Sequence, residues 1–243
     1  MKRYPVLILA YRRTLELEIV LKSIEQLKPN CVYFHIHNAP NEEAQKEVNE
    51  VKKLISLYDT FPKKILYSKE HLGCRGAMIK ALQWISGTEQ TFYVFEDDIV
   101  LKKDASKILG NKMEYLSAND GVLKFGENRE HAAYWGWATT SNTVKLLTDK
   151  AVWDIEEESV TPSFQDIWHY KGTMEAFKQG KAIAWDDEFH LITKVLSIKE
   201  YLTDNTLTEH TGVTTTRDTD NTSPMAHIMF RNGVLIPQEN DNV

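Results

Sequence analysis

The chain has 243 residues, of which 42% are hydrophobic and 26% are charged, and 29 basic against 35 acidic side chains give a formal net charge of −6. This composition is typical of a folded globular protein and excludes disordered, collagen-like and coiled-coil classes. Because sequence-independent nucleic-acid binding needs a basic footprint, we expect no nucleic-acid partner for this mildly acidic chain.

The sequence shows no sign of membrane insertion or secretion. No run of about 18 apolar residues is present, so no transmembrane helix is expected. Arg12 and Arg13 interrupt the first apolar run, which excludes the pattern of a signal peptide. The two cysteines, Cys31 and Cys74, can form no disulfide framework and lack the spacing of metal ligands. These observations favour a reduced, cytoplasmic protein.

Short apolar runs in the first hundred residues are too brief for helices. They predict buried strands over residues 4–11, 31–36, 63–68 and 91–96. Helical spacing predicts one helix opened by Thr14 as its cap, another starting near Asn41, and a third over residues 76–85. Such alternation with short links predicts the α/β class, with a mostly parallel sheet flanked by helices.

The alternation is less regular after residue 100. The pattern predicts, in order, a helix over 104–116, strands over 121–126 and 134–140, a helix over 161–180 and a strand over 181–185. From about Tyr201 a chain rich in Thr, Asp and Asn predicts a loop or tail. We expect one domain over 1–243, with a nucleotide-binding half over 1–100, an acceptor half over 101–215 and a tail over 216–243.

Glycine is absent from the first strand and the turn after it, since the first glycine is Gly73. No glycine-rich phosphate loop can follow that strand, which excludes the Rossmann fingerprint and the P-loop. The turn instead carries Ala10, Tyr11, Arg12 and Arg13. An aromatic ring and a guanidinium at the carboxyl end of a parallel strand could contact a base and a phosphate, and a solvated basic loop is the alternative.

Three consecutive acids, Glu96, Asp97 and Asp98, interrupt the apolar segment over 92–100. Crowded carboxylates repel one another and have raised pKa values unless a cation neutralises them. Mg²⁺ and Mn²⁺ typically bind one or two carboxylates together with substrate phosphates. Strand alternation predicts Glu96 and Asp98 on one side and Asp97 on the other. The segment therefore favours a Mn²⁺ or Mg²⁺ site over a solvated acidic turn.

Three segments in this order resemble a known family. The first strand with its arginine (5–13), HLGCRGAMIKALQWI (71–85) and FEDDI (95–99) are similar to GT-A glycosyltransferases, above all the N-acetylglucosaminyltransferase I-like type and related bacterial enzymes with an E-D-D metal motif. The resemblance covers residues 5 to about 215. It implies a Rossmann-like GT-A fold and a metal-dependent enzyme that moves a sugar from a nucleoside-diphosphate sugar, with UDP expected, to an acceptor hydroxyl.

The resemblance also assigns roles around the acidic triplet. It implies that Asp98 ligates a Mn²⁺ ion bridging the diphosphate, while Glu96 and Asp97 hold the ribose or the donor sugar. His210, in the segment EHTG (209–212), is similar to late H-x-G segments of the family that reach back towards the metal or diphosphate.

The same resemblance implies nucleotide contacts from three other turns. Arg12 would lie near the nucleotide, together with Ala10 and Tyr11. Asn38 follows the second strand where the family often has an aspartate contacting the base, a departure that leaves the base open. Gly73 and Arg75 match the loop that approaches the nucleotide.

The segment YWGWATTS (134–141) sets Trp135 and Trp137 around Gly136. Aromatic faces stack on sugar C–H surfaces and glycine permits close approach, although core packing is the commoner fate of tryptophan. The similar family segment lies under the donor sugar, so we expect these residues to contact it.

Asp166 lies among aromatic residues in FQDIWHY (164–170). A partly desolvated carboxylate gains proton affinity, which suits a general base acting on an acceptor hydroxyl. The segment resembles the motif that carries the base in inverting family members, and a retaining mechanism is the alternative. The rival is the acidic cluster Asp186, Asp187 and Glu188.

The sequence leaves two other functions open. A sugar-phosphate nucleotidyltransferase would share the sheet and the metal, but normally carries the early glycine-rich loop that is missing here. A non-catalytic nucleotide- or carbohydrate-binding protein with a relic site is the second. For a transferase, the expected acceptor is a carbohydrate or a glycolipid, and a glycolipid acceptor leaves room for peripheral membrane contact.

Overall fold

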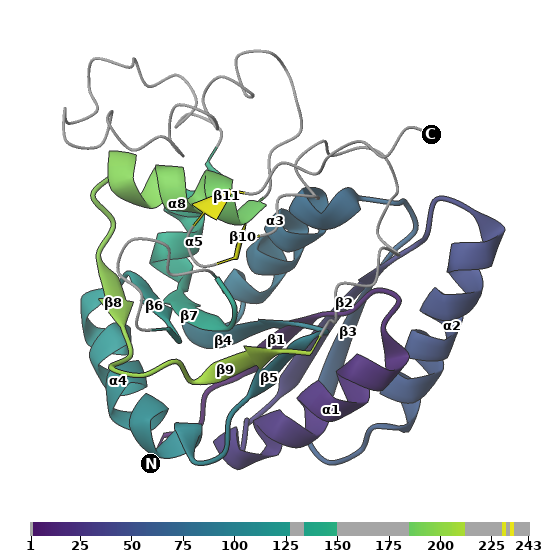
Figure 1. Ribbon diagram of the computed structural model, residues 1–243, viewed down its shortest axis with the longest axis horizontal. Helices are drawn as coiled ribbons and strands as arrows, with labels where there is room; N and C mark the ends of the chain where they lie inside the picture. The colour runs from purple at the N-terminus through teal and green to yellow at the C-terminus, as the bar shows by residue number, and fades with distance from the viewer. Residues whose placement is uncertain (1, 127–133, 150–184, 212–229, 232–233, 236–243) are drawn as a thin grey trace.

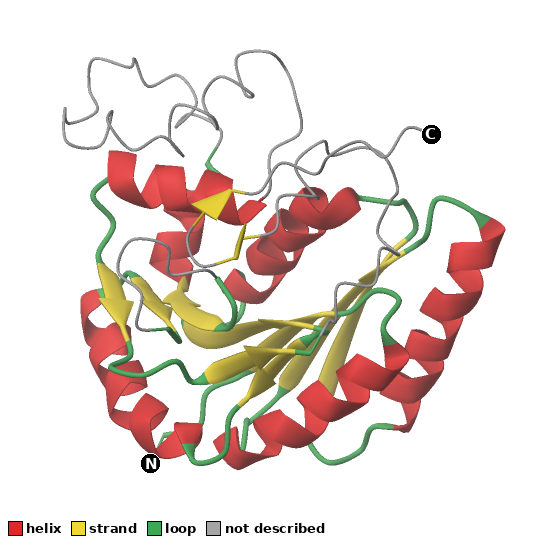
Figure 2. Ribbon diagram, in the orientation of Figure 1, coloured by secondary structure: helices red, strands yellow, loops and turns green. Residues whose placement is uncertain are grey.

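The computed structural model describes residues 2–126, 134–149, 185–211, 230–231 and 234–235. Helices cover a central sheet on both faces (Figures 1 and 2). No helix within those residues is both long and apolar enough to cross a lipid bilayer.

The central sheet has the strand order β3-β2-β1-β4-β7-β6-β8. Its strands are β1 (Val6–Leu9), β2 (Val32–His37), β3 (Lys63–Ser68), β4 (Thr91–Glu96), β6 (Val122–Lys124), β7 (Trp137–Thr140) and β8 (Glu200–Leu202). Strands β1 to β4 are mutually parallel, β7 runs antiparallel to both of its neighbours, and β8 is parallel to β6. The α/β class with a mostly parallel sheet, predicted from the sequence, is confirmed.

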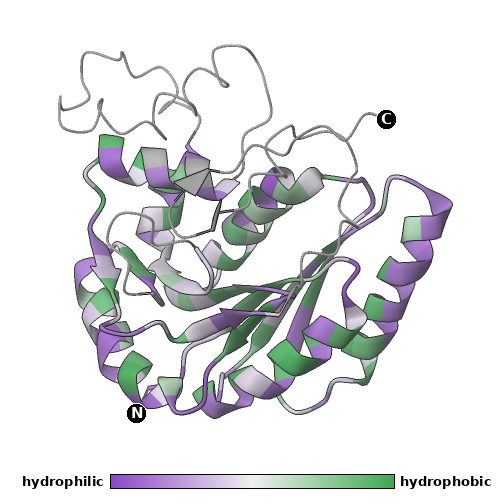
Figure 3. Cartoon of the chain, in the orientation of Figure 1, coloured by the Kyte–Doolittle hydropathy of each residue, from purple (hydrophilic) through white to green (hydrophobic). Residues whose placement is uncertain are grey.

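The helices fall into two groups, one on each face. The first group is α1 (Thr14–Ile24), α2 (Glu42–Leu57) and α4 (Ala105–Asn119), and the second is α3 (Gly73–Ser86), α5 (Ser141–Thr148) and α8 (Trp185–Val195). Strand β1 is apolar throughout because both of its faces are covered: Val6 and Ile8 belong to the core under the first group, and Leu7 and Leu9 to the core under the second. Figure 3 shows this apolar centre between helices whose outer faces are hydrophilic.

Shorter elements complete the fold. They are the 3₁₀ turn η1 (Glu25–Leu27) and the strands β5 (Ile99–Leu101), β9 (Thr208–His210), β10 (Phe230–Arg231) and β11 (Val234–Leu235). Strand β5 pairs antiparallel with β9, and β10 pairs antiparallel with β11, each outside the main sheet.

Local boundaries differ from the sequence predictions in instructive ways. Asn41 caps α2, since its side chain accepts a hydrogen bond of 2.9 Å from the Ala44 N–H. Thr14 is instead the first residue of α1, whose cap position is Arg13. The predicted strand over 181–185 is wrong at Trp185, which begins α8, and the predicted loop after Tyr201 contains β8 and β9. The predicted helix over 161–180 lies outside the described residues.

Candidate active site at the carboxyl edge of the sheet

The carboxyl ends of β1 and β4 lie side by side at the point where the strand order reverses. Strand β1 pairs with β2 on one side and with β4 on the other. The chain therefore adds β2 and β3 on one side of β1 and later adds β4 on the opposite side. Such switch points are where open α/β sheets place their ligands. The turns after these two strands carry Tyr11 to Arg13 and Glu96 to Asp98.

The acidic segment is a turn rather than one strand. Strand β4 ends at Glu96, Asp97 and Asp98 form the turn, and β5 begins at Ile99. Arg13 Nη1 lies 3.1 Å from Asp97 Oδ1 and 2.6 Å from Asp98 Oδ2. The prediction that Asp97 and Asp98 point to opposite sides is therefore wrong, because the turn breaks the strand alternation and turns both carboxylates towards one cation.

His210 reaches the acidic turn from late in the sequence. Strand β9 pairs with β5 in the register Ile99 opposite His210, which brings His210 Nε2 to 3.1 Å from Asp98 Oδ2. The next residue, Thr211, donates its backbone N–H (2.8 Å) and its hydroxyl (3.0 Å) to the Asp98 carbonyl. The structure thus brings together Asp98 and His210, the two metal ligands expected from the sequence.

Burial and neighbouring charges separate the pKa values of the acids. Burial raises the pKa of Asp97 to about 6, against the opposing effect of Arg13. Burial acts in the same direction on Asp98, but the hydrogen bond from His210 and the charge of Arg13 outweigh it and leave the Asp98 pKa below its ordinary value. Asp98 is therefore the carboxylate of the turn that is held most firmly in its charged form.

Of the three acids, Glu96 is the one whose negative charge is least offset by neighbouring cations. Burial and the charges of Asp98, Asp186 and Asp97 raise its pKa well above the ordinary value, and Arg13 opposes this only in part. The thiol of Cys74 lies 4.0 Å from Glu96 Oε2. Asp186, at the start of α8, thus belongs to the same group of charges, although it is distant in sequence.

An aromatic stack stands beside the acidic turn. The Tyr11 ring stacks on His37 with centroids 4.3 Å apart and planes 12° from parallel, and the His71 ring lies 5.2 Å from His37. The backbone N–H of Tyr11 also donates a 2.8 Å hydrogen bond to Asp97 Oδ2. The stack and the acidic turn are therefore joined directly. The resemblance points to His37 and Asn38 after the second strand, but nothing in the sequence indicates that His37 stacks with Tyr11 or lies beside His71.

Two residues expected to contact the nucleotide, Arg12 and Asn38, bind other parts of the chain. Arg12 Nε binds Glu47 Oε2 on α2 at 2.5 Å, so Arg13 and not Arg12 points into the acidic turn. Asn38 donates to the Lys69 carbonyl at 2.8 Å and accepts from Lys52.

Arg75, on α3, forms two hydrogen bonds to the buried Glu188 of α8, one of them 2.6 Å between Nη2 and Oε1. This pair joins two helices that cover the same face of the sheet. Gly73 opens α3 with a φ of +63°, a backbone conformation that favours glycine. Ala10 is buried, and its N–H donates to the His35 carbonyl.

The two tryptophans of segment 134–141 have different surroundings. Trp135 is 52% exposed, and its ring centroid lies 5.4 Å from that of His210. Trp137 is buried and packs against Trp185 and other core rings, so it supports the core, and the expectation that it faces a sugar is corrected.

Gly136 has a φ of +76°, and a Cβ there would lie 2.7 Å from Thr208 Cγ2. Only glycine therefore lets the residue just before β7 lie this close to β9, the strand that carries His210.

The expected general base Asp166 lies outside the described residues. Its rivals lie on α8. Glu188 is paired with Arg75, and Asp187 follows Asp186 in the helix. The charge of Asp186 helps to raise the pKa of Glu96. Within the described part of the chain, Asp186 is the member of that cluster whose charge reaches the acidic turn.

The residues present fit a divalent cation completed by substrate. No group of three or more His, Cys, Asp or Glu side chains able to hold a metal occurs in the described part. Mn²⁺ and Mg²⁺ need no such cage, because they bind one or two protein ligands and take further oxygens from phosphates and water. Asp98 supplies a buried, charged oxygen, and His210 a nitrogen beside it. The carboxylate of this donor set suits both Mn²⁺ and Mg²⁺.

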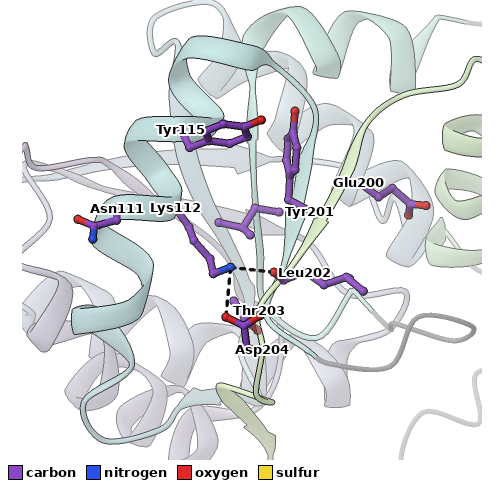
Figure 4. Close-up of a pocket in the computed structure, with 9 residues that line it drawn as sticks. Asn111, Lys112, Tyr115, Glu200, Tyr201, Leu202, Thr203 and Asp204 are labelled. Carbon is purple, nitrogen blue, oxygen red and sulfur yellow. Dashed lines mark hydrogen bonds and ion pairs between the residues drawn. The ribbon is translucent and has the colours of Figure 1, made fainter.

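A cavity of about 1000 Å³ opens away from this site, between α4 and β8 (Figure 4). Tyr115 and Tyr201 line it edge to face, with centroids 5.3 Å apart. Lys112 spans its floor, donating to the Leu202 carbonyl at 3.1 Å and pairing with Asp204 at 3.7 Å. None of the residues that line it belongs to the acidic turn.

Comparisons with known proteins bear on the fold. No protein-family model and no curated protein matches the chain. A mannosyltransferase, PcManGT from Pyrobaculum calidifontis in complex with GDP-Man and Mn²⁺, aligns with a TM-score of 0.51 at 11% identity, covering 88% of this chain and 58% of that one. The chain has a GT-A-type fold. It spans a little over half the length of that mannosyltransferase.

A second solved structure, 4-diphosphocytidyl-2C-methyl-D-erythritol synthase from Anaerococcus prevotii, aligns with a TM-score of 0.47 at 10% identity. That alignment covers 83% of this chain and 86% of the synthase. At such identities a structural likeness describes the path of the chain, and the activity has to be argued from the site itself.

Proposed function

We propose that this protein is a metal-dependent glycosyltransferase that moves a sugar from a nucleoside-diphosphate sugar, with UDP as the first candidate nucleotide, to a carbohydrate or glycolipid hydroxyl. The convergence of Arg13 and His210 on the Asp97–Asp98 turn, at the switch point between β1 and β4, carries this proposal. The mannosyltransferase of similar fold binds GDP-Man and Mn²⁺, which supports the same class of donor.

In this function the chain's own residues bind and orient the donor. Asp98 and His210 would hold the divalent cation. The Tyr11–His37 stack, with His71 beside it, offers an aromatic surface for the base. The exposed face of Trp135, next to His210, suits the C–H surface of the donor sugar.

A bound Mn²⁺ or Mg²⁺ supplies neutralisation of the charge that develops on the departing diphosphate. Arg13 adds a second cation whose planar guanidinium matches phosphate oxygens. Holding donor and acceptor in line supplies the orientation part of the rate enhancement.

Transfer with inversion needs a base for the acceptor hydroxyl. We assign that role to Asp166, by its aromatic surroundings in the sequence, with Asp186 as the alternative because its charge reaches the acidic turn. Either carboxylate would take the hydroxyl proton as the oxygen attacks the anomeric carbon.

A thermal-shift screen of UDP- and GDP-sugars with and without Mn²⁺ tests the proposal. We expect one nucleotide series to raise the melting temperature only when Mn²⁺ is present, and Asp98→Asn to abolish that rise. Absence of a shift with every nucleotide would overturn the proposal. Pyrophosphate release from a nucleoside triphosphate and a sugar phosphate would identify a nucleotidyltransferase instead. Binding without transfer or hydrolysis, unaffected by Asp166→Asn or Asp186→Asn, would identify a non-catalytic binding protein.

A further inference from the structure

Arg13 occupies the position in which a divalent cation would bind. A single guanidinium nitrogen, Nη1, lies 2.6 Å from Asp98 Oδ2 and 3.1 Å from Asp97 Oδ1. His210 Nε2 approaches the same Asp98 oxygen at 3.1 Å. Mn²⁺ and Mg²⁺ bind carboxylate oxygens at about 2.1 Å. An ion on Asp98 Oδ2 would therefore share that oxygen with Arg13 Nη1, and the two cations would repel each other strongly.

The carboxylates also need a cation when no metal is bound. The side chains of Asp97 and Asp98 are only 5% and 4% exposed, and a buried, unpaired carboxylate is costly. Arg13 supplies that neutralisation within the chain. Its own side chain is 35% exposed, so part of it already meets solvent while the two carboxylates are buried.

Contacts other than those of Arg13 also hold the turn. Asp97 Oδ2 accepts a hydrogen bond from the Tyr11 N–H, and the Asp98 carbonyl accepts two hydrogen bonds from Thr211. None of these contacts involves the guanidinium. The backbone of the turn and the Asp97 carboxylate therefore have supports that do not depend on Arg13.

We propose that Arg13 is an exchangeable internal cation: it fills the metal site of the empty protein and moves to the phosphates of the nucleotide when the divalent ion enters. This inference rests on the proposed function, because it requires a metal and a diphosphate at the acidic turn. Its consequence is coupling: metal and nucleotide each bind more tightly when the other is present, since the nucleotide gives Arg13 a new anionic partner.

Arg12 provides a matched control. It is the neighbouring residue and carries the same charge, but its guanidinium binds Glu47 on α2 and lies 5.9 Å from the centre of the Tyr11 ring. Removing the charge at position 12 changes the net charge of the turn as much as removing it at position 13. A difference between the two variants therefore isolates the contact of Arg13 with the carboxylates.

The first experiment titrates Mn²⁺ into the nucleotide-free protein and follows free Mn²⁺ by electron paramagnetic resonance. We expect Arg13→Gln to bind Mn²⁺ about tenfold or more tightly than wild type, Arg13→Lys to fall between them, and Arg12→Gln to stay within about twofold of wild type. Unchanged or weaker Mn²⁺ binding by Arg13→Gln, with circular dichroism showing a folded protein, overturns the inference. An equal gain in Arg12→Gln overturns it too, because general charge would then explain the effect.

The second experiment measures UDP and GDP binding at saturating Mn²⁺ by calorimetry. We expect Arg13→Gln to bind the preferred nucleotide about tenfold more weakly and to show less coupling between metal and nucleotide than wild type. Metal and nucleotide affinities that move in the same direction contradict the exchange. If wild type and all variants bind neither Mn²⁺ nor nucleotide, the proposed function is wrong as well. If all of them bind both normally and substitution of Arg13 has no effect, only the role proposed for Arg13 is wrong.

Discussion

Asp98 Oδ2 and His210 Nε2 lie 3.1 Å apart although they come from the middle and the late part of the chain. The pairing of β5 with β9 makes this contact, since Ile99, next to Asp98, stands opposite His210 in the register. A mixed carboxylate–imidazole pair is thereby fixed by backbone hydrogen bonds rather than by the side chains alone.

His210→Ala tests the metal pair. We expect Mn²⁺ affinity, measured by calorimetry in the presence of nucleotide, to fall about tenfold or more because one of the two proposed protein ligands is lost. Glu209→Gln is the control, since Glu209 is exposed on the same strand and pairs with Lys102. Equal losses in the two variants would show that charge on β9, and not ligation by the imidazole, matters.

Glu96→Gln should stabilise the metal-free protein at pH 7. A carboxyl whose folded-state pKa is raised is protonated in both folded and unfolded states well below pH 4.5, and its contribution to stability is lost as the pH rises from 4.5 through the raised folded-state pKa. We expect the variant to melt about 2–4 °C higher at pH 7, as about 1 kcal/mol produces in a chain of this size, and the gain to vanish near pH 4. Glu43→Gln, exposed on α2, controls for the loss of one negative charge.

His35 makes the opposite contribution to pH dependence. Burial, followed by the charge of the neighbouring His37, lowers its pKa to about 4 from 6.5. The unfolded chain then takes up the proton first, so stability falls as the pH drops from about 6.5 to about 4. His35→Gln removes the titrating group and should reduce the loss between pH 7 and pH 4.5 by about 1–2 kcal/mol in urea unfolding, since one pKa unit corresponds to about 1.4 kcal/mol.

Ser68→Ala is the companion to the His35 experiment. It removes the 3.0 Å hydrogen-bond partner of His35 Nε2 without removing a titrating group. We expect a similar loss of stability at pH 7 and pH 4.5. A wild-type pH dependence in His35→Gln would contradict the assignment to His35.

Gly136→Ala should destabilise the protein by about 1–3 kcal/mol in urea unfolding. The new Cβ would meet Thr208 Cγ2 at 2.7 Å and Phe125 Cδ2 at 3.0 Å, at a backbone φ of +76°. Because Thr208 begins β9, we also expect weaker Mn²⁺ binding through displacement of His210. Gly126→Ala is the control, since no heavy atom lies within 4 Å of the Cβ it would add. Equal losses of stability at both glycines would show that the loss comes from reduced backbone freedom and not from contact with β9.

Asp166→Asn and Asp186→Asn separate the two candidate bases. The variant that lacks the base should lose about 10²- to 10⁴-fold in kcat while its donor affinity changes little, because the base acts on the acceptor hydroxyl. The other variant should retain most of its kcat. Retained turnover in both would exclude an aspartate base at either position.

The parts of the fold that depend on local pattern could be predicted from the sequence. Strands β1 to β4 and helix α2 follow from apolar runs, helical spacing and the Asn41 cap. Strands β8 and β9 could not be found in this way, because they are short and polar and depend on pairing with partners remote in sequence. Strand pairing of this kind leaves little local signal.

Part of the candidate site could likewise be predicted from the sequence, and part of it could not. The resemblance to GT-A glycosyltransferases pointed to Asp98 and His210, and the structure brings them together. Whether Arg12 or Arg13 contacts the acidic turn depends on which guanidinium faces the edge of the sheet. The sequence of two adjacent arginines does not indicate which of them does so. Trp137 shows the converse difficulty, because a tryptophan beside a glycine has the same sequence pattern in a core as in a sugar site.

The pairing of β5 with β9 has a consequence for synthesis on the ribosome. The acidic turn emerges early, whereas the imidazole that faces it belongs to a strand made far later. A nascent chain that has reached only the end of α4 contains the strands β1 to β4 but not yet the imidazole of His210. Cation loading is therefore expected to be a late event, and truncations that end before β9 should yield a folded sheet that captures manganese poorly.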